Sequence, residues 1–72
     1  MRMVNDLIKI ANAGGGMILD ARPIMTDNLV KIAIAASNTS SKIILKNVNN
    51  KTTNDLIRIA VAGQGNVIFD FN

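Results

Sequence analysis

The sequence predicts a small α/β protein in which three helix–strand units form a three-stranded parallel sheet, in the order 1-2-3, with three helices on one face. One similar phrase occurs three times, as NDLIKIANA at 5–13, DNLVKIAIA at 27–35 and NDLIRIAVA at 54–62. A short apolar segment follows each phrase. Repeats of about two dozen residues are typical of stacked units that bury each other's apolar faces. We therefore expect 1–72 to form a single α/β repeat domain, with units at about 4–25, 26–52 and 53–72.

Each phrase has the periodicity of an amphipathic helix. In the first phrase, Leu7, Ile10 and Ala11 share one face at about 100° per residue, and Lys9 lies opposite. At about 140° from the leucine, the three phrases have Asn12, Ile34 and Val61. If this flank faces the preceding helix, the polar Asn12 indicates that the first helix begins the stack. A column of small residues, Ala13, Ala35 and Ala62, would then let neighbouring helices approach closely.

The ends of the helices carry capping residues. Thr26 and Thr53 are placed where a hydroxyl group could accept a hydrogen bond from the first turn. Gly14 and Gly63 follow the last periodic residues, as glycines at helix C-termini do, and Asn38 could take the left-handed conformation in the second unit. The glycines follow a helix and precede a strand, so we interpret them as chain reversals and not as phosphate-binding loops.

The apolar segments at 17–20, 43–46 and 67–71 are too short for helices and rich in β-branched residues, which favours strands. Strands separated by helices pair in parallel through right-handed crossovers. With all three helices on one face of the sheet, the other face is free of helices. Because side chains alternate between the two faces along a strand, this free face carries two rows of side chains. The first row is Ile18, Ile44 and Ile68, and the second is Asp20, Lys46 and Asp70. We expect Lys46 to stabilise a cross-strand ladder by about 0.2–1 kcal/mol per pair.

Composition excludes several classes of function. The chain has no cysteine and no histidine, which excludes disulfides and disfavours a structural zinc site. Its acidic residues are five aspartates, and tyrosine is absent, so few groups could act as acid, base or nucleophile. We expect neither an enzyme nor a cofactor. The apolar runs are far shorter than a membrane span, and the N-terminus is a poor signal peptide, so we expect a cytoplasmic protein without membrane contact.

The helix-free face is the strongest functional lead. Natural parallel sheets are normally covered on both faces, and an exposed apolar patch usually marks association. We therefore expect a non-catalytic interaction or structural protein that forms a homo-oligomer through the two rows. The alternative is a small binding module that captures a different protein, regulatory or toxin-neutralising, on the same face. Nucleic-acid binding through Lys9, Lys31 and Arg58 is disfavoured, because the net charge is only +3 and no aromatic side chain accompanies them.

The strand–turn–helix repeat resembles the leucine-rich repeat of the ribonuclease-inhibitor type. The stretches that carry the resemblance are ILDARPIMTDNLVKIAIAASN at 18–38 and IILKNVNNKTTNDLIRIAVAG at 43–63. The resemblance implies a protein-binding scaffold that uses the helix-free face of its sheet.

Overall fold

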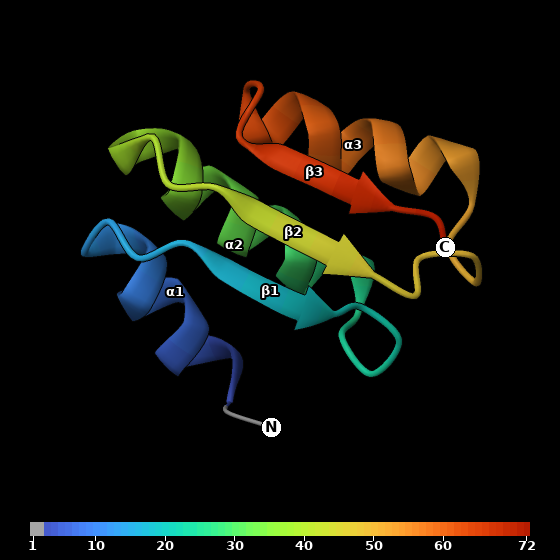
Figure 1. Cartoon of the computed structure of the whole chain (residues 1–72), viewed down its shortest axis with the longest axis horizontal. Coiled ribbons are helices and arrows are strands. Elements are labelled where there is room, and N and C mark those ends of the chain that lie inside the picture. Colours follow the sequence, from blue (N-terminus) through green and yellow to red (C-terminus); the bar gives the residue numbers. More distant parts are fainter. Residues whose placement is uncertain (1–2) are drawn as a thin grey trace.

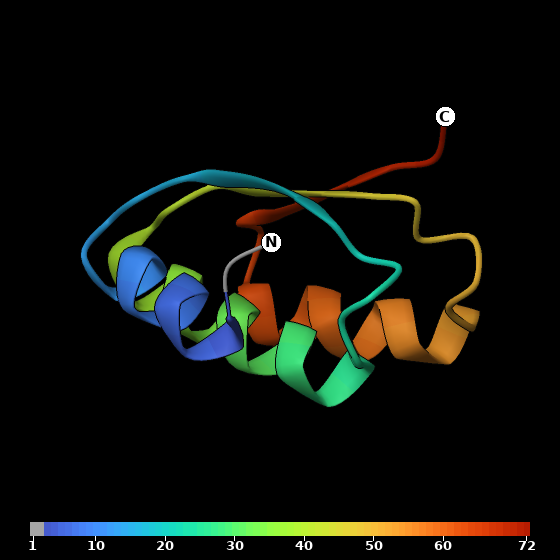
Figure 2. The same cartoon turned by 90° about the horizontal axis from the view of Figure 1, so that it is seen from below.

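The computed structural model describes residues 3–72 and shows helices alternating with strands along the chain. The helices are α1 (Val4–Asn12), α2 (Thr26–Thr39) and α3 (Thr53–Gly63), and the strands are β1 (Met17–Asp20), β2 (Ile43–Lys46) and β3 (Val67–Asp70). The strands form one parallel sheet in the order β1-β2-β3 (Figure 1). All three helices lie in one layer on the same side of this sheet (Figure 2). The predicted fold class, strand order and placement of the helices are therefore confirmed.

The core lies between the two layers and is centred on β2 and α2. Ile43 and Leu45 point from β2 toward the helices and are fully buried, as is Leu29 of α2. Alternate residues of the same strands point to the other face, as expected for a pleated strand. The strand-to-helix loops also contribute apolar side chains, which close one end of the core. These loop residues, Ile24 and Val48, are as buried as the residues of the helices.

The predicted N-caps are displaced by one residue. The N-cap of α2 is Met25, which makes no side-chain capping bond, and Thr26 is already helical. The N-cap of α3 is Thr52, whose hydroxyl accepts a hydrogen bond from the Asp55 amide at 3.1 Å. The assignment of the two caps to Thr26 and Thr53 was therefore wrong. Consecutive threonines at the start of α3 offer two similar hydroxyls, and only the backbone conformation selects between them.

Of the three residues predicted to end the helices at their C-termini, only Gly14, after α1, has the predicted role. Gly14 has a φ of +94°, which glycine adopts without steric cost. In α2 the left-handed residue is Ser40, because the helix continues through Asn38 to Thr39. In α3 it is Gln64, and Gly63 is still helical. The expected roles of Asn38 and Gly63 were therefore wrong.

Gly63 is required for packing. A Cβ atom at this position would collide with the side chain of Val67 and would meet the Cβ of Ala33 at 3.7 Å. The small residue thus brings the end of α3 close both to β3 and to α2.

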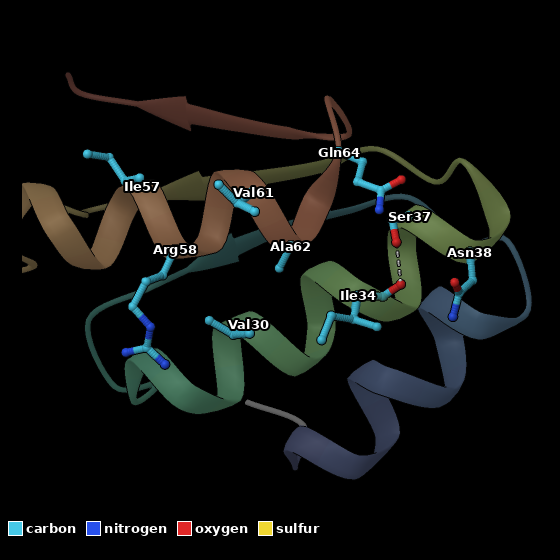
Figure 3. A pocket seen from close by; sticks show the side chains of 9 residues that line it. All are labelled: Val30, Ile34, Ser37, Asn38, Ile57, Arg58, Val61, Ala62 and Gln64. Atoms are coloured by element: carbon cyan, nitrogen blue, oxygen red, sulfur yellow. Dashed lines mark hydrogen bonds between the residues drawn. The ribbon is translucent and has the colours of Figure 1, made fainter.

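The sequence suggests that the flank containing Ile34 and Val61 faces the preceding helix. In the structure it does not. The two side chains are 47% and 71% exposed. They point away from the sheet, on the outer surface of the helix layer (Figure 3). The column that contains Ala35 and Ala62 is the less exposed one, with Ala35 buried and Ala62 half-buried.

Candidate functional site

The helix-free face carries the three isoleucines in one row. Ile18, Ile44 and Ile68 are in register across the three strands. Ile18 and Ile68 are 66% and 49% exposed, and Ile44 is half-buried. Seen edge-on, the sheet has the helix layer on one side and its other side open (Figure 2). The structure therefore brings the predicted apolar residues together on an uncovered surface.

The charged row is also in register, with Lys46 paired to Asp20 on one side and to Asp70 on the other. The side chains nevertheless do not form the predicted ladder. Within residues 3–72, Lys46 has no ion pair, and Asp20 is instead bound by Arg22. The expected stabilisation by Lys46 was therefore wrong, although the alignment of the row was right.

Arg22 displaces Lys46 because it lies only two residues from Asp20 and binds both carboxylate oxygens. Its Nη2 lies 3.0 Å from Oδ2, while its Nε and its backbone amide donate to Oδ1 at 3.3 and 3.0 Å. A bidentate guanidinium–carboxylate pair is stronger than a single ammonium contact. The Arg22 side chain, helped by its amide, lowers the pKa of Asp20 to about 2. At the end of β3, Asp70 accepts from the Asn72 amide at 3.0 Å, again two residues further along the chain.

The area of this face limits what it can bind. With strands about 4.8 Å apart and about 3.3 Å per residue, three strands of four residues span only about 200 Å² before side-chain relief is counted. A standard stable interface removes about 800 Å² of accessible surface from each partner. The face by itself therefore supports a weak contact.

The helix layer has an apolar groove that the sequence analysis did not identify. It has a volume of about 570 Å³ and lies between α2 and α3 (Figure 3). Its lining residues are Val30, Ile34, Ser37, Asn38, Ile57, Arg58, Val61, Ala62 and Gln64. The signal in the sequence is the pair of apolar residues Ile34 and Val61, although their periodicity equally suits a contact between helices.

An ion pair between the helices lies at one end of the groove. Arg58 extends from α3 toward the start of α2, where its Nη2 lies 2.9 Å from Oδ1 of Asp27 (Figure 3). Its Nη1 lies 3.9 Å from Asp55 on α3 itself. The predicted basic stripe of Lys9, Lys31 and Arg58 is exposed. Because Arg58 is engaged by two aspartates, the stripe attracts an anionic partner less than its three positive charges suggest.

The hydroxyl groups that contact one another have a structural role. Thr39 donates its hydroxyl proton to the Ala11 carbonyl at 2.7 Å, and the hydroxyl of buried Ser41 lies 2.7 Å from the Thr39 oxygen, to which it donates, and 3.3 Å from the same carbonyl. They satisfy a buried carbonyl in the last turn of α1 and attach this end of α1 to the end of α2. Over the described part of the chain, no three acidic side chains come together as a cation site would require.

No helix within residues 3–72 combines the length and the apolar character that crossing a bilayer requires. Compared with protein-family models, with curated proteins and with solved structures, the chain matches none of them. The resemblance to leucine-rich repeats therefore stays a prediction.

Proposed function

We propose that this chain is a non-catalytic interaction protein that self-associates through the helix-free face of its sheet. The observation that carries the proposal is the uncovered row of Ile18, Ile44 and Ile68. Parallel sheets are normally covered on both faces, because their apolar side chains otherwise remain in water. A second copy supplies a matching apolar row and removes both rows from solvent.

The charged row restricts how two copies can meet. If the sheets faced each other about a two-fold axis parallel to β2, Lys46 would lie over Lys46 of the second copy. Asp20 would then lie over Asp70 of that copy. Like charges brought together at an interface oppose association. We therefore expect the strands of the two copies to run in opposite directions, which separates the two charged rows.

The small face sets the expected strength. An interface well below the standard size gives transient association, so we expect a dissociation constant of about 10–1000 µM. The oligomer should consequently form and dissociate over an accessible range of protein concentration.

The test is the mass in solution by sedimentation equilibrium, from tens of micromolar to about one millimolar. Ile44→Asp should lower the mass reached at each concentration, because it places a charge at the centre of the face and prevents face-to-face pairing. Ile18→Lys, at a more exposed position, should do the same with less effect on folding. Ile57→Asp is the matched control on the helix layer, where the same chemical change should leave the mass unchanged. Unaltered association of folded Ile44→Asp and Ile18→Lys would contradict the proposal.

The second candidate is a binding module that takes a different protein on the same face, in a regulatory or toxin-neutralising role. The limited area favours it, because a larger partner could add contacts beyond the rim of the sheet. A chain that stays monomeric across this concentration range would favour this candidate. The absence of catalysis and the cytoplasmic location remain predictions.

A further inference from the structure

We infer that copies of this chain also join head to tail, with β3 of one copy beside β1 of the next, so that sheet and helix layer continue across the junction. This contact shares the proposed role in self-association but uses a different surface from the helix-free face. Either contact can therefore fail without the other.

The backbone hydrogen bonds show which groups are free at the two edges. Met17 of β1 donates its N–H to the Lys42 carbonyl at 3.0 Å, and Ile43 of β2 donates to the Asn66 carbonyl at 2.9 Å. In a parallel pair, the N–H and C=O of one residue point the same way, and successive residues alternate. The backbone N–H and C=O groups of odd-numbered strand residues therefore point toward the following strand, and those of even-numbered residues point toward the preceding strand.

The same alternation describes the two outer edges. On β3, Val67 and Phe69 direct their backbone groups away from β2, and on β1, Ile18 and Asp20 direct theirs away from β2. Inside the sheet, odd-numbered residues of one strand bond to even-numbered residues of the next strand. The free backbone groups of β3 belong to odd-numbered residues and those of β1 to even-numbered residues, so the two edges match in the same way. The β3 edge of one copy can thus receive the β1 edge of another without a change of register or direction.

The helix layer carries matching surfaces at its two ends. Toward the following helix, Ala11 of α1 and Ala33 of α2 are buried, and Gly63 of α3 lies against Ala33. The aligned residue of α3 is Ala60, which is exposed because no helix follows it within the described chain. Toward the preceding helix, Ala35 of α2 is buried, and the aligned Ala13, directly after α1, is exposed.

An isoleucine beside the second alanine column shows the same end effect. Ile32 of α2 is 1% exposed, whereas the aligned Ile10 of α1 is 36% exposed. Both have the same chemistry and the same place in the repeated phrase. A copy of α3 packed against α1 would cover Ile10 as its counterpart is covered.

Charges make this junction weaker than those inside the chain. In register, Asp70 would stand beside Asp20 of the next copy, although Arg22 already holds that carboxylate. The ion pair of Arg58 with Asp27 has no counterpart, since the aligned residues there are Lys9 and Asn54. We therefore expect reversible assembly, in which the row of isoleucines is extended by Ile18 of each added copy.

Disulfide formation between two single-cysteine variants tests the junction, because the unaltered chain has no cysteine. Neighbouring strands lie about 4.8 Å apart, within the Cα separation that a disulfide spans, whereas stacked sheets lie about 10 Å apart. Under mild oxidation, a mixture of Ile18→Cys and Ile68→Cys should yield mainly the heterodimer. The double variant should yield a ladder of covalent multimers.

The controls distinguish this contact from the others. Asn50→Cys, in an exposed loop, reports the rate of random collision. Heterodimers that form no faster than Asn50→Cys dimers overturn the head-to-tail junction. Each single-cysteine variant is also oxidised alone. If Ile68→Cys or Ile18→Cys forms homodimers as fast as the mixture forms heterodimers, the proposal is overturned, because identical edges then pair with each other. Cross-linking that survives Ile44→Asp separates this junction from the face-to-face contact.

A second measurement uses the helix layer. Ala60→Lys places a charge at the junction, while Val61→Lys places it on the outer surface of the same helix. Both positions are exposed in the single chain, so neither change should impair folding. Head-to-tail cross-linking should slow about tenfold or more in the Ala60→Lys background, because burying an unpaired charge is costly, and should be unchanged in the Val61→Lys background. Equal rates in both backgrounds overturn the proposal.

Discussion

Adding one methyl group at Gly63 tests how tightly α3 is packed. The residue ends the helix in a conformation that an alanine can adopt, so the backbone does not oppose the change. The new Cβ would, however, collide with a methyl group of Val67 and lie 3.2 Å from its Cβ. Valine has few rotamers with which to move away, and β3 is held by its pairing with β2.

Two opposing effects decide the sign. Alanine is favoured over glycine in a helix by about 0.8–1.0 kcal/mol. Overpacking of a well-filled region costs about 1–3 kcal/mol. Because the collision is with a stiff side chain, we expect the second effect to dominate, and Gly63→Ala to lower the free energy of unfolding by about 1 kcal/mol.

Val67→Ala removes the methyl groups that obstruct the new Cβ. In this background, Gly63→Ala should be neutral or stabilising by up to about 1 kcal/mol, since the helical preference remains. The coupling between the two sites should then be about 1–2 kcal/mol, a value expected only for residues in contact.

Urea denaturation of the four proteins, followed by circular dichroism, measures the complete cycle. Gly63→Ala that stabilises the otherwise unaltered chain, or equal effects in both backgrounds, would refute the packing argument. Comparing the slopes of the urea transitions shows whether the denatured state has changed instead.

Three further predictions concern the core, a helix cap and the ion pair on the sheet. Ile24→Ala should cost about 2–5 kcal/mol in urea denaturation, because the side chain is fully buried, and a loss below about 1 kcal/mol would contradict its place in the core. Thr52→Ala should cost about 0.5–2 kcal/mol and Thr53→Ala less, and the reverse order would mean that the cap lies at Thr53. Arg22→Gln should raise the pKa of Asp20 from about 2 toward 3.8. Since the native pair lowers this pKa, its stabilisation should be complete above about pH 4 and lost as pH falls toward 2. NMR titration showing an unchanged pKa of Asp20 in this variant would contradict the assignment.

The sequence alone was sufficient for the fold and for the rows of the sheet. Helical and strand periodicities are local properties, so the three phrases and the three apolar segments could be assigned without knowledge of their contacts. The repetition then made a single strand order the simplest one. Because alternate strand residues share a face, the alignment of Ile18, Ile44 and Ile68 followed from counting residues.

Only the tertiary structure decided which side chains meet. The periodicity of a helix shows that Ile34 and Val61 share a flank, but the rotation of each helix on the sheet places that flank in solvent. Strand register aligns Lys46 with Asp20, but the direction of the chain after β1 brings Arg22 closer. These outcomes depend on distances of a few ångströms between elements, which no local pattern contains. The same contacts bury Ile32 and leave Ile10 exposed, although the two residues hold the same position in the repeated phrase.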